Sequence, residues 1–120
     1  MPVPVDIGIG IFYWGTSNMR TVADTRYKSL GYAQITDLSA AVGLPSIPAG
    51  AWYVAIQIEL QDVRYRDDGV DPTDEVGMII KAGDPPSWIN VDNLENVLLI
   101  EMDAGAIANV TYYAPGTEVA

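Results

Sequence analysis

Large apolar residues alternate strictly with smaller or polar ones over residues 51–60 of the chain. Successive side chains of a β-strand point to opposite faces, so this period of two directs one set of side chains into a core. The tryptophan, tyrosine and β-branched residues of the stretch also suit a half-buried sheet surface. The pattern therefore predicts a central strand whose inward residues are Trp52, Val54, Ile56, Ile58 and Leu60.

A second alternation follows at residues 63–66, where Arg64 and Arg66 leave the same face of a short predicted strand. Asp67, Asp68 and Gly69 come directly after it. Aspartate and glycine tolerate the positive φ that short hairpin loops require, so these three residues predict a tight hairpin turn. The two arginines and the turn together form one candidate site.

Further alternating or apolar runs predict more short strands. They lie at residues 20–27, 29–35, 76–80, 88–91, 96–102 and 107–113. The run 96–102 is mostly apolar, which is consistent with a strand buried on both faces or nearly so. Short strands spaced roughly ten residues apart are typical of sandwiches and barrels. The expected fold is all-β, an antiparallel β-sandwich of the jelly-roll or immunoglobulin-like type.

Residues 36–43 form the one predicted helix, in a connection between strands. Thr36 or Asp37 can cap its start, and Gly43 can end it. At about two turns it is too short to be stable without packing against the sheets.

The predicted organisation has three parts: residues 1–18 as an extended N-terminal arm or first strand, residues 19–114 as the sandwich, and residues 115–120 as a tail. Isoleucines alternating with glycine and aspartate in the first part support a strand of the domain's own sheet. The alternative is an arm that docks on a neighbouring subunit through apolar anchors. The candidate anchors are Ile11, Phe12, Tyr13 and Trp14.

Composition narrows the function classes. The 120-residue chain has no cysteine, which excludes disulfides and thiolate metal sites, and no histidine, which removes the commonest general base. Its formal charge of −10 argues against partners such as nucleic acid or an anionic membrane. The start of the chain lacks the features of a secretory signal, and no run approaches the roughly 20 apolar residues of a membrane span.

Four kinds of chemistry bear on the function. The acidic residues near Gly69 could offer oxygen ligands to calcium, but their spacing does not match an EF-hand loop, and no metal is predicted. Phosphate-binding and dinucleotide motifs are missing, so neither a cofactor nor catalysis is expected. The aromatic residues could form a sugar-stacking platform, although aromatics in strands more often lie in cores or interfaces. Asn109-Val110-Thr111 is a glycosylation sequon, but it falls within a predicted strand and is discounted.

Several spaced motifs resemble a group of small proteins encoded among the structural genes of tailed bacteriophages. The resemblance covers roughly residues 38–113 and rests on an Ile-Pro-x-Gly-Ala segment, an Arg-aromatic-Arg-Asp-Asp-Gly hairpin and an Asn-Val-x-Tyr-Tyr end. In this chain they are Ile47-Pro48-Ala49-Gly50-Ala51, Arg64-Tyr65-Arg66-Asp67-Asp68-Gly69 and Asn109-Val110-Thr111-Tyr112-Tyr113. The first 35 or so residues have no counterpart in the group.

The resemblance implies a non-enzymatic virion structural protein, made in the host cytoplasm and placed on the capsid surface. It implies a decoration or cement protein that bridges capsomers, with the major capsid protein or other virion proteins as partners. Such proteins often assemble as homo-oligomers, commonly trimers. The alternatives are a carbohydrate-binding module of a phage fibre and a neck or tail-completion protein.

Overall fold

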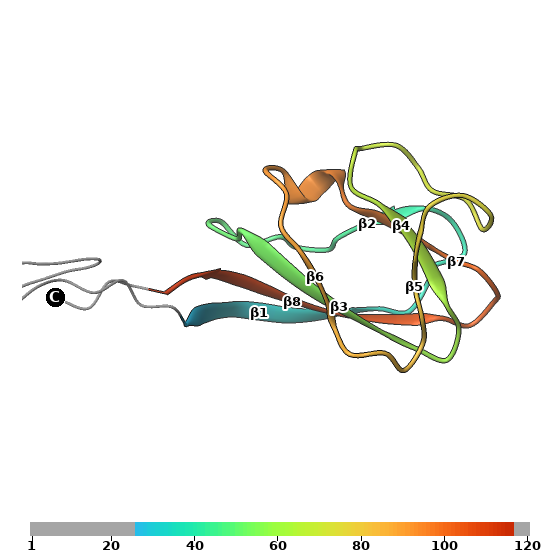
Figure 1. Cartoon of the computed structure of the whole chain (residues 1–120), viewed down its shortest axis with the longest axis horizontal. Helices are drawn as coiled ribbons and strands as arrows, with labels where there is room; N and C mark the ends of the chain where they lie inside the picture. Colours follow the sequence, from blue (N-terminus) through green and yellow to red (C-terminus); the bar gives the residue numbers. More distant parts are fainter. Residues whose placement is uncertain (1–25, 117–120) are drawn as a thin grey trace, which may run out of the picture. The chain divides into compact units, whose positions relative to one another are not determined.

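The computed structural model describes residues 26–116, and they form an all-β domain, as predicted (Figure 1). The elements are β1 (Tyr27–Ile35), β2 (Val42–Gly43), β3 (Tyr53–Glu59), β4 (Val63–Arg66), β5 (Met78–Ile80), β6 (Ser87–Ile89), the 3-10 turn η1 (Leu94–Asn96), β7 (Leu98–Glu101) and β8 (Ile107–Pro115). Residues 28–114 make up one compact unit. No helix of the described part could span a membrane.

The strands form two antiparallel four-stranded sheets, with orders β1-β8-β3-β6 and β2-β7-β4-β5. The pairings are nested: β1 lies beside β8, β2 beside β7, β3 beside β6 and β4 beside β5. A long hairpin folded over on itself gives this order, which is that of a jelly roll. Of the two sandwich types that the sequence predicts, the structure therefore has the jelly roll.

The core lies between the two sheets, and β3 is central to it. Val54, Ile56 and Ile58 have no exposed surface, which confirms the inward face predicted for this strand. The neighbouring strand β8 buries alternate residues in the same way, ending with Tyr112 at 2% exposed. Val63, Leu99 and Ile80 complete the core from the opposite sheet.

The two ends of the predicted inward face are wrong. Trp52 precedes β3 and is 58% exposed, and Leu60 follows it and is 69% exposed. Leu60 has φ of 75°, and the Gln61 amide donates to the Glu59 carbonyl at 2.9 Å across it. This is a three-residue turn of the strained kind with positive φ. The chain reverses at Leu60, and its side chain is turned out of the sandwich.

The helix predicted at residues 36–43 does not form. Asp37 accepts hydrogen bonds from the amide and hydroxyl of Ser39, at 3.1 and 2.6 Å. The hydrogen bond from the amide is of the kind that an N-cap makes, but it closes one local turn and no helix follows it. Leu38 is fully buried and its carbonyl accepts from the Glu101 amide at 3.0 Å, so the segment is held in the core by tertiary contacts. The short helical turn of the domain is instead η1, capped by Asn93.

Two further strand predictions differ in part from the structure. Leu99 of β7 is buried and the other three residues are half-buried, so the strand is nearly, but not fully, buried on both faces. A single strand, β1, spans the break expected at residue 28. Leu30 and Ile35 of β1 both pack on the core, although their odd spacing would place them on opposite faces of a regular strand. Gly31, with φ of 149°, lies between them and takes up the irregularity.

The predicted arm lies outside the described residues, as do its anchors Ile11, Phe12, Tyr13 and Trp14. The division into arm, sandwich and tail stays a prediction. At the edge of the described part, the Gly116 amide donates to the Arg26 carbonyl at 2.8 Å.

Candidate functional site

The residues of the predicted hairpin turn organise a longer loop. β4 ends at Arg66 and its antiparallel neighbour β5 begins at Met78, so residues 67–77 connect them and the prediction of a tight turn is wrong. β4 also pairs with β7 on its other side. The loop therefore leaves the sheet at β4 and returns to the sheet edge at β5.

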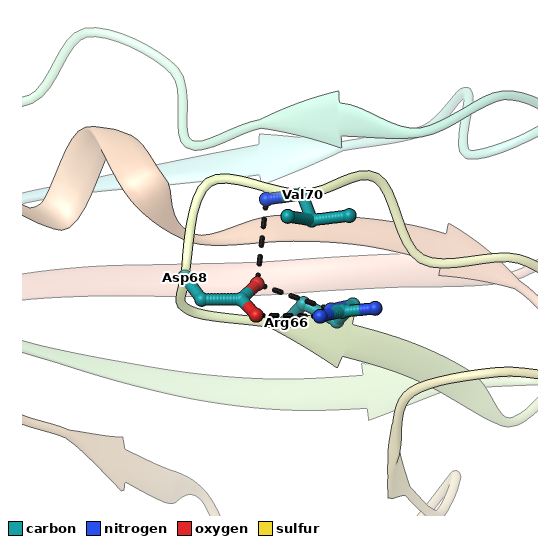
Figure 2. Close-up of polar contacts among 3 residues, drawn as sticks. All are labelled: Arg66, Asp68 and Val70. Carbon is teal, nitrogen blue, oxygen red and sulfur yellow. Dashed lines mark hydrogen bonds and ion pairs between the residues drawn. The ribbon is translucent and has the colours of Figure 1, made fainter.

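Arg66 and Asp68 close the first bend of this loop (Figure 2). The Arg66 guanidinium donates to both carboxylate oxygens of Asp68, with Nε–Oδ1 at 3.0 Å and Nη2–Oδ2 at 2.5 Å. The Val70 amide donates to the same carboxylate at 3.3 Å. These hydrogen bonds, the one from Arg66 first, lower the pKa of Asp68 below its ordinary value, and the pKa of Arg66 is raised. This bidentate ion pair fixes the path of the backbone at the start of the loop.

Gly69 fits the bend for two reasons. Its φ of 79° is one that residues with a Cβ rarely adopt. Its amide donates to the Asn96 carbonyl at 3.1 Å, and a Cβ at this position would lie 3.2 Å from Asn96 Oδ1. This hydrogen bond joins the loop to η1, which lies in the connection between β6 and β7.

Arg64 holds the far end of the loop. Its Nε donates to the Asp74 carbonyl at 3.2 Å and its Nη1 to the Gly77 carbonyl at 2.7 Å. Gly77 packs closely there, because a Cβ would meet the Tyr65 carbonyl at 3.1 Å. Both predicted arginines are therefore engaged in shaping the loop.

The acidic residues of the loop do not converge on a metal site. No group of three or more acidic side chains in the described part of the chain is placed to hold an ion. Asp68 is engaged with Arg66, and Asp62 accepts from the Ala82 amide at 2.8 Å. These two carboxylates serve local side-chain and backbone bonding.

The loop and the strand that follows it expose apolar side chains. Val76 is 54% exposed, Met78 64% and Ile79 47%. We refer to these three residues as the β5 edge, because β5 is the outermost strand of its sheet. A shallow hollow beside them is lined by Val76 and Met78 together with Arg66, Asp67 and Asp68.

A second surface lies on the outer face of the other sheet, where three aromatic rings meet. Trp88 of β6 and Tyr113 of β8 flank β3, and their ring centroids are 4.8 Å apart. Tyr53 of β3 lies 6.5 Å from Trp88. Ala55, opposite Trp88 in the ladder, is only 8% exposed, yet it is not part of the inner core. The rings meet over this small residue.

Polar side chains occupy the same face farther along the strands. Asn109 of β8 is their centre. Its Oδ1 accepts from the Tyr32 hydroxyl at 2.5 Å and from Gln34 Nε2 at 3.1 Å. Its Nδ2 donates to Gln57 Oε1 at 3.0 Å and to Glu59 Oε2 at 2.6 Å. All four hydrogen-bonding positions of the Asn109 amide are used.

Sequence reasoning found the arginines and the acidic turn but not the surfaces they support. The exposure of the β5 edge depends on β5 being an outer strand, which no local pattern reveals. Asn109 drew notice only as part of a sequon, and its central position depends on the register of three strands.

Comparisons of the chain with protein-family models, with curated proteins and with solved structures find no match.

Proposed function

We propose that the protein is a non-enzymatic virion structural protein of a tailed bacteriophage, a decoration or cement protein that stabilises the head by bridging capsomers. The observation that carries the proposal is the apolar β5 edge, displayed on a loop that charged residues hold in shape. The motif resemblance supplies the virion setting. The jelly roll is compatible with it, because this architecture recurs in viral capsid domains.

The β5 edge has the properties of a surface that becomes covered. Edge strands of monomeric proteins are usually kept short or protected by charge, proline or a bulge; β5 is only three residues long, but those residues, Met78, Ile79 and Ile80, are all apolar. Large exposed apolar side chains grouped in this way mark protein contact sites. The partner we propose is the major capsid protein or a neighbouring virion protein.

The loop chemistry supports the same proposal. Arg64, Arg66 and Asp68 bond within the loop, so they fix the backbone that presents the apolar residues. A surface fixed before binding loses less conformational entropy when its partner docks. The arm anchors Ile11, Phe12, Tyr13 and Trp14 would add a second contact to a neighbouring subunit.

The first test is to measure copy number. Purified particles are separated on a denaturing gel, and this protein is quantified against the major capsid protein. A ratio near one to one or one to three supports a decoration protein. A few copies per particle indicates a neck, tail-completion or fibre protein instead, and absence of the protein overturns the virion proposal.

The second test addresses the β5 edge. Met78→Glu places a charge at the centre of the proposed contact and is expected to weaken binding to capsids that lack the protein by about ten-fold or more. The matched control is Leu60→Glu, which changes an equally exposed leucine away from this edge. Equal binding by both variants and the unchanged protein would exclude the edge as the contact.

The arm is tested separately. Removing the first 15 residues is expected to abolish capsid or subunit association while the β-fold, followed by circular dichroism, is retained. If the shortened protein still binds fully, the arm is not an anchor.

A further inference from the structure

We propose that the outer face of the β1-β8-β3-β6 sheet binds a neutral glycan, with the ring cluster stacking on one sugar and the polar side chains around Asn109 bonding the next. The inference concerns the opposite sheet from the β5 edge and does not rest on the proposed virion role.

The ladder shows that the two parts of the site share one face. Tyr53 pairs with Tyr113, Ala55 with Thr111, and Gln57 with Asn109. Residues two apart along a strand point to the same side, whereas Val54, Ile56 and Ile58 between them point into the core. The aromatic and polar groups therefore lie on successive rows of the same surface.

The aromatic end offers the kind of surface on which sugars stack. Trp88 is 51% exposed, although Tyr113 lies against it. The apolar C–H groups on one side of a pyranose ring pack on aromatic faces, and a rigid ring loses little entropy when it binds a ligand. Trp52, 58% exposed and 6.4 Å from Tyr53, continues the aromatic surface towards a hollow that it lines with Asn90 and Asp92.

The polar end is held ready for hydroxyl groups. The side-chain amide of Asn109 uses all of its hydrogen-bonding capacity on four neighbouring side chains and so fixes their positions. These neighbours are Tyr32, Gln34, Gln57 and Glu59. Each neighbour retains capacity of its own: Gln57 keeps an NH₂ group that donates, Glu59 a second carboxylate oxygen that accepts, and Tyr32 its hydroxyl oxygen. Tyr32 is 62% exposed. A set of fixed donors and acceptors suits the alternating hydroxyls of a sugar.

The spacing between the two ends matches a short saccharide. The row of Trp88 and Ala55 is two residues from the row of Gln57 and Asn109, which is about 7 Å along the strands. Thr111 is the third member of the row of Trp88 and Ala55, so no further row separates the rings from the polar groups. One sugar over the rings would place its neighbour against the polar groups.

Charge selects a neutral ligand. No member of the polar group is cationic, Glu59 is anionic, and the chain as a whole carries −10. Sialylated, sulfated or phosphorylated glycans would be repelled, because like charges disfavour one another across a contact.

The test uses the full-length protein titrated with maltohexaose, cellohexaose and xylohexaose, with sialyllactose as the anionic comparison, followed by tryptophan fluorescence and calorimetry. At least one neutral oligosaccharide is expected to bind, and sialyllactose is not. Trp88→Ala is expected to weaken binding at least about ten-fold. Gln57→Ala, which leaves the rings in place, is expected to weaken it several-fold.

Gln61→Ala, just beyond the end of β3, is the matched control and should bind as the unchanged protein does. Absence of binding to all three neutral oligosaccharides, or binding that neither variant weakens, would overturn the inference. Preferential binding of sialyllactose would also overturn it. Met78→Glu should retain glycan binding, so the glycan site and the capsid contact can fail independently.

Discussion

At the scale of single residues, the structure separates side chains that shape the backbone from those that meet a partner. Arg66 and Asp68 carry opposite charges on an exposed loop and would ordinarily suggest a binding or metal site. Their fork of hydrogen bonds instead fixes the first bend of residues 67–77. Apolar side chains, Val76 and Met78, are exposed beside them together with the acidic residues of the loop.

Leu60 fits the alternating pattern of the sequence, but its side chain does not point into the core. It continues the alternation of β3, but it occupies a turn with φ of 75° and is 69% exposed. A residue with a Cβ is strained in such a turn, and the exposed side chain of Leu60 contributes little to the stability of the fold.

We therefore expect Leu60→Gly to stabilise the domain by up to about 1 kcal/mol, because glycine adopts positive φ without strain. The measurement is the urea midpoint of unfolding. Leu60→Val is the control and should destabilise, since a β-branched residue is a poorer fit to positive φ. A lower midpoint for the glycine variant would show that the turn is not strained.

At the scale of elements, the predictions succeeded where local pattern decides and failed where tertiary contacts decide. The alternation of residues in β3 was sufficient to predict the strand and the inward side chains at its centre, because the period of two assigns each side chain to one face. The helix at residues 36–43 was wrong because burial of Leu38, its backbone bond to Glu101 and the pairing of Val42 and Gly43 with β7 outweigh weak helical preference. Of the candidate surfaces, the loop residues could be named from the sequence, whereas the Asn109 cluster requires the register of β1, β8 and β3.

The loop between β4 and β5 gives an element-scale prediction. Gly77→Ala should lower the melting temperature by several degrees, because its Cβ would meet the Tyr65 carbonyl at 3.1 Å and φ is 138°. It should also weaken capsid binding, since the loop presents Val76 and Met78. Gly83→Ala is the matched control: its φ is 84°, but a Cβ there meets nothing within 4 Å. The two variants should differ by the cost of the close contact, and equal melting temperatures would argue against tight packing at Gly77.

At the scale of the whole molecule, the nested pairing makes β8 and β1, far apart in the sequence, neighbours in one sheet. Strand spacing indicated a sandwich but could not choose between the jelly-roll and immunoglobulin-like orders, because pairing partners are not encoded in local periodicity. Tyr112 helps to hold this arrangement: it is buried in β8, and its hydroxyl donates to the Pro45 carbonyl of the loop before β3.

The stability of the domain should fall in alkali. Burial raises the pKa of Tyr112 to about 12, above the ordinary value of 10.0. The unfolded chain then loses the proton first, so this contribution is complete below pH 10 and is lost between about pH 10 and 12. The change amounts to at most about 3 kcal/mol.

Urea midpoints at pH 8 and pH 11 measure this effect. Tyr112→Phe should be about 1 kcal/mol less stable at pH 8, where it lacks the hydrogen bond, and should lose less stability on going to pH 11. Part of the loss should persist in the variant, because burial also raises the pKa of Tyr65. An identical loss in both proteins would show that Tyr112 does not carry the alkaline sensitivity.

The hydrogen bond between Gly116 and Arg26 brings together the two points at which the chain enters and leaves the jelly roll. A domain with adjoining ends can be spliced into a surface loop of a host protein without stretching either chain. The same adjacency allows its ends to be linked and new ones opened elsewhere, as in circular permutation. The described domain is therefore suited to use as a transplantable display module.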